Sequence, residues 1–480
     1  SLLLNTTGAF NTAVGALALD ANTTADKNTA IGYNSLTTNT TGADNTAVGH
    51  ASLSANSTGA SNTALGRGAL GDNTTASNNT AVGNFTLVSN TTGANNTAVG
   101  ANAADAITTG SYNTAIGKGA LSTATTASSN TAVGESSLNQ NTGNSNTGIG
   151  YHALSSNTTG EANASLGKEA LKNNTTGTYN TGLGHQALET NTTASNNTAV
   201  GSNSLYANTT GTENTAVGSN TLTANTTASY NTALGYNALS ANTTGTENTG
   251  LGNRCLDANT TGSSNTAVGQ AALTNATTAG NNTAVGDNAL TANTTGGYNT
   301  SIGDRASYSN TTGQYNVALG SQTLYFNTTG SKNVAIGYQT LSSNTTASSN
   351  TAVGDQALET NSTGGFLTGI GDRALHLNTT GDYNNALGAQ ALYNNTTGSN
   401  NTAVGHQALS ANTTAGNNTA VGYDALEANT TGDYNTALGV LALKTNTVGD
   451  RNTAIGSFAL NTFNPTSGNV DSYNTALGYS

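Results

Sequence analysis

Five histidines are the side chains with which this chain could carry out acid–base chemistry or hold a metal ion. A catalytic base or a metal cage needs partner residues at a defined short spacing. His185 and Glu189 are close in sequence, but both fall at positions whose residue type varies freely along the chain. No nucleophile elbow, zinc-protease, Cys-x-x-Cys, phosphate-loop or calcium-nonapeptide motif is present. We therefore expect no enzyme, no catalytic residue, no metal and no cofactor. The histidines are His50, His152, His185, His376 and His406.

A second candidate for chemistry is the repeated tripeptide Asn-Thr-Thr, which matches the acceptor sequence for N-linked glycans. It begins, for example, at Asn157, Asn174, Asn208 and Asn412. If these asparagines were modified, the protein would carry a column of sugars. A turn asparagine followed by β-prone threonines explains the same letters without any modification. Both interpretations are open at the level of sequence.

Charge and cysteine content narrow the range of partners. The chain has 23 acidic and 11 basic residues and a net charge of −12, with no basic stripe, so we expect no nucleic-acid partner. No apolar run approaches the ~20 residues that cross a bilayer, so we expect no membrane insertion. Cys255 is the single cysteine, which excludes an intrachain disulfide.

These residues belong to a tandem repeat that fills the chain. Asn11, Asn28 and Asn45 begin successive repeats, and 28 such starts extend to Asn474. Of the 27 intervals between them, 25 are 17 residues long, one is 16 and one is 22. We therefore predict one continuous solenoid over residues 1–480, a fragment of a longer chain, with an expanded loop at 463–471 that includes Pro465.

Certain columns of the repeat are nearly constant. Numbered from its first asparagine, the repeat that starts at Asn401 has Val404 at position 4, Gly405 at position 5, Leu409 at position 9 and Asn412 at position 12. Positions 6, 7, 10, 11, 16 and 17 vary and carry most charges and tyrosines. We expect the constant columns inside the protein and the variable columns outside. This fixed register also argues against disorder, despite a composition in which only 7% of residues are charged.

The repeat predicts an all-β fold, a parallel β-solenoid (β-roll) of 17-residue coils. Glycine at position 5 and several asparagines interrupt any helical pattern. Thr-Ala-Val and Ala-Leu instead predict two short strands per coil, each closed by a turn. Coils stacked at ~4.8 Å would make a rod on the order of 130 Å long. The aligned asparagines could form amide ladders along the stack.

Two large apolar residues per coil, at positions 4 and 9, make a thin core. Positions 3 and 4 face opposite sides of an extended strand, so both faces of that strand are apolar. We therefore predict that a second chain covers one of these faces, in a homo-oligomer.

The segments NVALG (Asn316–Gly320) and NVAIG (Asn333–Gly337) resemble the SVAIG-type repeats of trimeric autotransporter adhesin heads. The NTAVGxxALxxNTTG pattern is also similar to repeats of bacteriophage tail fibres and bacterial surface fibres. The resemblance covers the whole chain, although the adhesin repeat is shorter and has valine where position 2 here is usually threonine. It implies a homotrimeric β-roll, located outside the cell, on a cell surface or in a virion fibre.

Two classes of function follow. The first is a structural fibre or adhesin shaft, self-associating as a trimer or into end-to-end filaments, that attaches a microbe or phage to a receptor or glycan. The alternative is a binding module. Threonines at positions 2, 13 and 14 suggest an ice-binding face, and tyrosines at position 17 suggest stacking on sugars, although they could equally cover the turn below. These tyrosines are Tyr112, Tyr179, Tyr230, Tyr298, Tyr315, Tyr383 and Tyr434.

Overall fold

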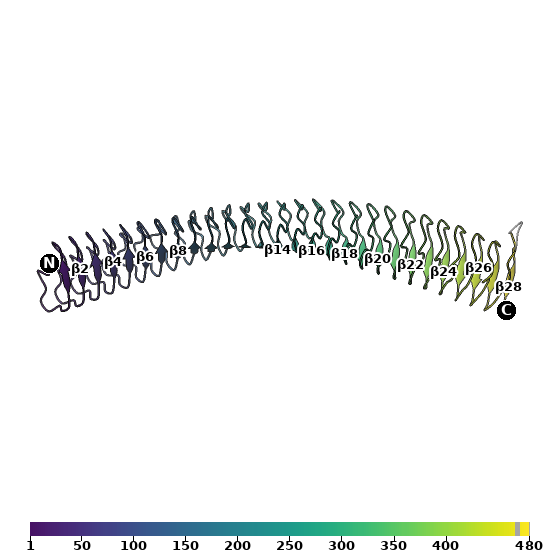
Figure 1. Cartoon of the computed structure of the whole chain (residues 1–480), viewed down its shortest axis with the longest axis horizontal. Coiled ribbons are helices and arrows are strands. Elements are labelled where there is room, and N and C mark those ends of the chain that lie inside the picture. The colour runs from purple at the N-terminus through teal and green to yellow at the C-terminus, as the bar shows by residue number, and fades with distance from the viewer. Residues whose placement is uncertain (466–470, 480) are drawn as a thin grey trace. The chain divides into compact units, whose positions relative to one another are not determined.

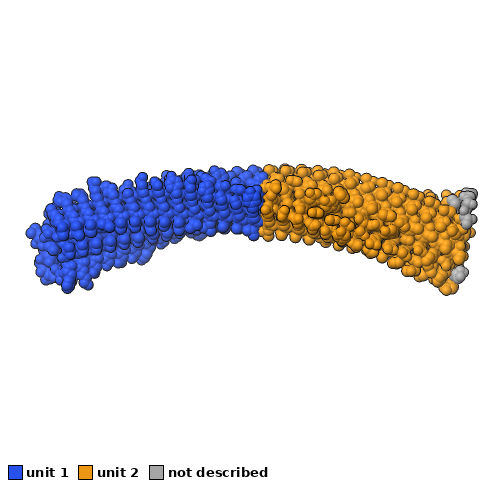
Figure 2. Space-filling view, viewed as in Figure 1, with its two compact units in different colours: residues 1–244 blue, residues 245–480 orange. Residues whose placement is uncertain are grey.

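The computed structural model describes residues 1–465 and 471–479. All its strands are three residues long and lie at positions 2–4 of a repeat, and no helix occurs in the described residues. The chain divides into two compact units, with residues 1–244 in unit 1 and residues 245–480 in unit 2 (Figure 2). The loop expansion predicted at 463–471 falls largely outside the described residues, because it includes 466–470.

Unit 1 contains fourteen strands, one in each repeat (Figure 1). They are β1 Thr12–Val14, β2 Thr29–Ile31, β3 Thr46–Val48, β4 Thr63–Leu65, β5 Thr80–Val82, β6 Thr97–Val99, β7 Thr114–Ile116, β8 Thr131–Val133, β9 Thr147–Ile149, β10 Ala164–Leu166, β11 Thr181–Leu183, β12 Thr198–Val200, β13 Thr215–Val217 and β14 Thr232–Leu234.

The described residues of unit 2 contain fourteen further strands (Figure 1). They are β15 Thr249–Leu251, β16 Thr266–Val268, β17 Thr283–Val285, β18 Thr300–Ile302, β19 Val317–Leu319, β20 Val334–Ile336, β21 Thr351–Val353, β22 Thr368–Ile370, β23 Asn385–Leu387, β24 Thr402–Val404, β25 Thr419–Val421, β26 Thr436–Leu438, β27 Thr453–Ile455 and β28 Thr475–Leu477.

Within each unit consecutive strands pair in parallel, with every residue opposite the residue at the same position of the next repeat. In β24 and β25, for example, Ala403 is opposite Ala420 and Val404 is opposite Val421. This register confirms the predicted parallel β-solenoid with 17-residue spacing. It also places equal side chains in ranks along each unit, so any column of the repeat becomes a row on the surface or in the core.

The second strand predicted at Ala-Leu is absent from the described residues. Positions 7 and 9 have left-handed backbone angles, as Gln407 (φ 54°) and Leu409 (φ 55°) illustrate, and this conformation breaks an extended strand. The segment still bonds to its neighbours, because the Gln407 amide donates to the Ala389 carbonyl (3.0 Å) and the Leu409 amide donates to the Ala425 carbonyl (3.0 Å). The coil therefore continues its cross-coil hydrogen bonds through a turn.

Fewer apolar columns lie in the interior than the sequence predicted. Ala403, Ala408 and Leu409 are fully buried, as expected for constant columns. Val404 was expected inside, but position 4 points outward and Val404 is only half-buried. The alternation of an extended strand turns position 3 inward, and therefore positions 2 and 4 outward. The core consists mainly of alanine, one leucine in nearly every coil and the asparagine side chains, with a buried serine or threonine in place of alanine in some coils, such as Ser35 and Thr86.

Two ranks of buried asparagine complete this interior and confirm the predicted amide ladder. Asn412 donates through Nδ2 to Asn395 Oδ1 (2.8 Å) in the preceding coil and to the Ala415 carbonyl (3.0 Å). Asn401 donates to the same Ala415 carbonyl (2.8 Å), and its Oδ1 accepts the backbone amide of Asn418 in the next coil (3.0 Å). Asn401 and Asn412 thus each tie their own turn to an adjacent coil, with their side-chain nitrogens satisfied away from water.

Cys255 provides a probe of this interior. Its thiol is fully buried in the alanine column at position 8 and contacts the Gly252 carbonyl (3.2 Å). Burial raises the pKa of Cys255 to about 12, and the Asp257 charge adds to the effect. Because the thiolate is the reactive form, we expect iodoacetamide at pH 8 to leave the folded chain unmodified and to alkylate it rapidly in denaturant. Mass spectrometry measures this difference; comparable rates in both states would contradict it. Cys255→Ala should fold normally.

Candidate functional surfaces

The four sequon asparagines named above lie in the interior. Asn157, Asn174, Asn208 and Asn412 are all fully buried. Each uses its Nδ2, the atom that would carry a glycan, for two hydrogen bonds; Asn174, for example, donates to Asn157 Oδ1 (2.7 Å) and to the Gly177 carbonyl (3.0 Å). A glycan at these positions would replace a ladder bond and would need space that the packed coil does not have. The folded solenoid therefore has no accessible acceptor at these sites.

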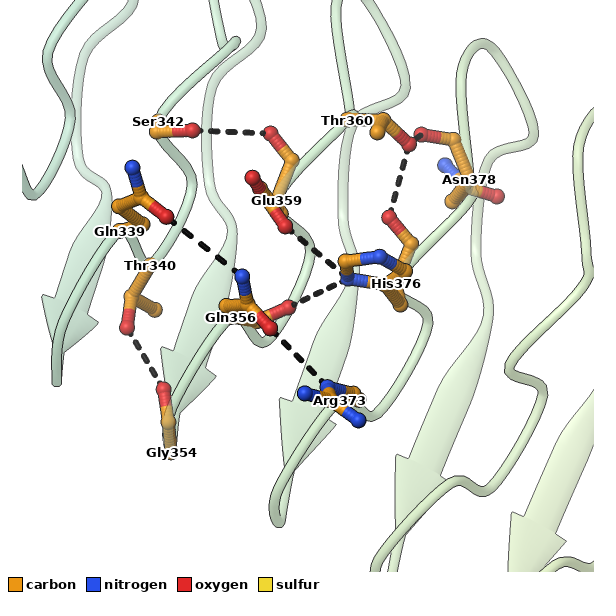
Figure 3. A network of polar contacts seen from close by, with 10 residues as sticks. All are labelled: Gln339, Thr340, Ser342, Gly354, Gln356, Glu359, Thr360, Arg373, His376 and Asn378. Atoms are coloured by element: carbon orange, nitrogen blue, oxygen red, sulfur yellow. Dashed lines mark hydrogen bonds and ion pairs between the residues drawn. The ribbon is translucent and has the colours of Figure 1, made fainter.

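His376 is the histidine with the most polar contacts (Figure 3). Its Nδ1 lies 3.3 Å from Glu359 Oε2 and 3.2 Å from the Gln356 carbonyl oxygen. Its ring stacks on Tyr393 at a centroid distance of 5.1 Å. Gln356 also accepts a hydrogen bond from Arg373 Nε (3.0 Å). This network is a set of contacts between neighbouring coils, in which the Thr360 hydroxyl donates to the His376 carbonyl (2.7 Å) and the Ser342 hydroxyl donates to the Glu359 carbonyl (3.3 Å).

The remaining histidines do not assemble into a site. His50, His152 and His406 contact the rings of Tyr33, Tyr151 and Tyr423, respectively. The predicted neighbours His185 and Glu189 form no ion pair in the described part of the chain, where Glu189 lies 4.0 Å from Lys172 Nζ instead. Among the described residues no group of three or more His, Cys, Asp or Glu side chains could hold a metal ion.

Asp105 is a carboxylate with an unfavourable environment. Burial raises its pKa above the ordinary value, although the backbone amides of Asp105 and Ala106 oppose the shift. Its Oδ1 is buried without a hydrogen-bond partner. The charged form is therefore less stable in the folded protein than in the unfolded chain.

Asp105→Asn should raise the free energy of unfolding at pH 7. Because the folded-state pKa is the higher one, the wild-type chain loses stability as the pH rises above the unfolded-state value of about 3.9. The variant lacks this dependence, so its advantage should disappear below that pH. Urea unfolding between pH 3.5 and 7 measures both effects. Asp355→Asn, which changes an exposed carboxylate, is the control. An advantage that is equal at all pH values would contradict the assignment.

The outward side of the strands forms a surface that we call the strand face, made of positions 2 and 4. Threonine occupies most of position 2, and valine, isoleucine or leucine occupies position 4. In unit 2, Ile302, Ile370 and Leu387 are 40–41% exposed, so this apolar rank is only half covered by its own chain. The register of the strands repeats the pair on each coil of a unit.

The predicted tyrosines at position 17 lie on the surface and partly stack on one another. All seven are between 52% and 67% exposed. Tyr298 and Tyr315 are parallel, with centroids 5.0 Å apart and an interplanar angle of 8°, and Tyr383 stacks in the same way on Phe366 (5.2 Å, 7°). The Arg451 guanidinium lies 5.5 Å from the Tyr434 ring centroid. Neighbouring coils thus supply the partners of Tyr298, Tyr315, Tyr383 and Tyr434.

A further surface, which we call the 7/10 surface, is formed by positions 7 and 10 of neighbouring coils. Lys444 at position 10 contacts Asp424 at position 7 (2.9 Å) and Glu427 at position 10 (3.0 Å). These hydrogen bonds, Asp424 first, raise the pKa of Lys444. Sequence reasoning missed this surface because both columns vary. Position 7 has a left-handed backbone angle, and although Asn or Gly occupies it in some coils, such as Asn34 and Gly119, Gln and Arg occupy it in others, so the sequence gives no consistent signal.

Neither a protein-family model nor a curated protein matches this chain. No helix among the described residues is long and apolar enough to cross a bilayer.

Proposed function

We propose that this chain is a non-enzymatic structural fibre or adhesin shaft that works outside the cell, on a microbial surface or in a phage fibre. In this role it associates with itself, most simply as the homotrimer of the adhesin heads that its repeats resemble. Its task is mechanical: the solenoid projects a binding surface away from the particle that carries it. Attachment to a receptor or glycan would follow from that position.

The observation that carries this proposal is the apolar rank of the strand face. Position 4 side chains such as Leu166 (48% exposed) and Leu234 (49% exposed) lie on the outside of the sheet in unit 1. Covering a half-exposed aliphatic side chain gains on the order of 1 kcal/mol, and the same gain recurs on each coil. A long row of this kind marks an interaction surface. Two further copies of this chain carry the same row with the same spacing, so they are the partners that match it coil by coil.

Light scattering on the purified chain tests the proposal by comparing the particle mass with the 47.4 kDa of one chain. We expect three chains. The triple variant Ile302→Glu, Ile336→Glu and Ile370→Glu should reduce the mass to one chain, because it buries three charges in the proposed interface. The matched control Thr329→Glu, Thr346→Glu and Thr380→Glu changes exposed residues outside the strand face and should leave the trimer intact. A wild-type monomer would contradict the trimer.

The same face also favours the alternative function, ice binding. Thr402 and Val404 lie side by side on β24, and Thr419 and Val421 repeat the pair in register on β25. Regular ranks of hydroxyl and methyl groups are suited to ordering water on a flat lattice. This role requires a strand face clear of other chains. A monomer that slows ice growth in a thermal-hysteresis measurement, and loses this activity in the triple glutamate variant, would establish it in place of the fibre.

A further inference from the structure

The 7/10 surface contains an aromatic stack that stops abruptly. Tyr308 and Tyr325 occupy position 10 of neighbouring coils, with parallel rings (8°) whose centroids are 5.2 Å apart. The next coil has Ser342 at position 10, so no third ring continues the stack. A hollow of about 150 Å³ lies at this place. Its lining residues are Gln322, Tyr325, Phe326, Gln339 and Ser342.

Phe326 lines this hollow but does not take the place of a third ring in the stack. Its ring plane is 82° from that of Tyr325, at a centroid distance of 4.7 Å, so it forms a wall and not a further ring of the stack. Phe326 is also 53% exposed. The hollow therefore offers an incoming flat ring a place to lie next to Tyr325, with a second apolar surface beside it.

Amide groups form the polar side of the hollow. Gln339 Nε2 donates to Gln322 Oε1 (3.0 Å), and Gln356 Nε2 approaches Gln339 Oε1 (3.5 Å) in the next coil; Figure 3 shows the second contact. The ladder ends at Gln322, because Arg305 at position 7 of the preceding coil carries only hydrogen-bond donors. The amide nitrogen of Gln322 therefore has no acceptor in its own column, and the Gln322 and Gln339 side chains together line the polar side of the hollow.

Unit 1 contains a second hollow with a related lining but no second aromatic ring. Tyr206 occupies position 10, the next coil has Thr223 there, and Gln186 and Asn203 at position 7 form the amide side. These four residues line a hollow of about 270 Å³. Both units thus have an aromatic ring followed by a small residue, with two amide side chains at position 7 in the lining. In unit 1 the Gln186 amide nitrogen donates to Glu169 Oε2 (3.2 Å), so its oxygen is the group that remains for a ligand.

We propose that these two hollows are binding sites for single hexopyranose rings of a neutral polysaccharide. A sugar ring has a C–H face that stacks on tyrosine and a rim of hydroxyls that both donate and accept hydrogen bonds. In each hollow the tyrosine ring can stack on the C–H face of the sugar, and the amide side chains beside it can hydrogen-bond with the hydroxyls. A nucleobase would also stack, but its phosphate chain would meet a protein of net charge −12. The site goes beyond the fibre role and does not depend on the trimer, since positions 7 and 10 lie outside the strand face.

The test uses the full chain on a printed array of neutral hexose, N-acetylhexosamine and uronic-acid oligosaccharides, followed by titration of the tightest binder. Tyrosine fluorescence can report binding directly, because the chain has no tryptophan. The double variant Thr223→Tyr and Ser342→Tyr places the missing ring in each hollow. We expect it to weaken binding at least tenfold while folding normally, since Tyr325 already stacks on Tyr308 in this way. Tyr206→Ala with Tyr325→Ala should give the same loss by removing the platform.

The matched control is Thr329→Tyr with Thr346→Tyr, which adds two tyrosines at exposed residues that line neither hollow and should bind like the wild-type chain. Undiminished binding by the ring-filled variant would overturn the proposal, and so would a wild-type chain that binds no sugar on the array. A preference for uronic-acid oligosaccharides would contradict the proposal that the ligand is a neutral polysaccharide. Because the particle mass is measured separately, failure of this site would leave the fibre proposal standing, and the reverse also holds.

Discussion

Replacing Gly117 by alanine should lower the free energy of unfolding by about 3 kcal/mol or more, whereas Gly119→Ala should change it by about 1 kcal/mol or less. Gly117 is at position 5 and has φ +136°, a conformation that is essentially restricted to glycine. A Cβ there would lie 2.4 Å from the Gly134 carbonyl oxygen of the next coil. The backbone cannot move away from this atom without breaking the cross-coil register.

Gly119 is a close control because it lies in the same turn, also with a positive φ (+62°). A Cβ at Gly119 would meet no heavy atom nearer than 3.8 Å. Ala51 and Ala271 occupy the same position in other repeats with φ values of 55° and 54°. Urea unfolding followed by circular dichroism measures both variants. Equal stability of the two would show that the solenoid relaxes around position 5, and would contradict the steric account of its constant glycine.

The sequence alone was enough to predict the fold class because the repeat places equal side chains above one another. The 17-residue register, the inward Ala403 and the asparagine ladder through Asn401 and Asn412 all follow from that single geometric fact. Parallel pairing without a helix was predictable for the same reason. The physical content of these predictions lies in the spacing of the residues and not in the strand propensity of any one of them.

The prediction of a second strand at Ala-Leu was wrong, because the strand propensity of these residues does not indicate the backbone angles that they adopt in the turn. Leucine rarely adopts a positive φ, yet Leu409 does so with φ 55°. The local strain is offset by the environment, since the Leu409 side chain is fully buried and its amide bonds to Ala425. Stacked neighbours supply both interactions, and they act only once the coils have assembled. The same turn aligns positions 7 and 10, which is why the hollow beside Tyr325 could not be predicted from the sequence.

The Asn-Thr-Thr sequons match the acceptor pattern for glycans, but the structure buries their asparagines, such as Asn157 and Asn174, in the interior. Asn-Thr-Thr satisfies the acceptor pattern, but Asn157 and Asn174 use their side-chain nitrogens to hold adjacent coils. The motif recurs because the turn and the ladder both need asparagine at position 12. The structural reason alone accounts for the repetition, and the pattern carries no separate evidence for sugar.

Asn378→Asp should destabilise unit 2 by about 3–5 kcal/mol at pH 7. Asn378 is fully buried; its Nδ2 donates to Asn361 Oδ1 (2.8 Å) and to the Gly381 carbonyl (3.1 Å), and its Oδ1 accepts from Asn395 (2.7 Å). A carboxylate would replace both donor hydrogens by a charged acceptor that faces two oxygens. The column itself tolerates the apolar residues Ile107, Ala124 and Ala276, but contains no acid. Position 12 therefore tolerates the loss of a ladder hydrogen bond, whereas we expect that it does not tolerate a buried charge.

The pH dependence of this variant distinguishes charge from lost packing. Burial and the facing oxygens should raise the folded-state pKa of the new carboxyl above its unfolded value of about 3.9. The loss should therefore be small below that pH, where the acid is protonated and can still donate one hydrogen bond, and should grow as the pH rises towards the folded-state value. Asn400→Asp, at an exposed position in the same unit, should show neither effect. Urea unfolding of both variants at pH 3.5 and pH 7 measures the contrast. A loss in Asn378→Asp that did not change with pH would mean that shape, and not the donors of the amide ladder, determines the requirement for asparagine.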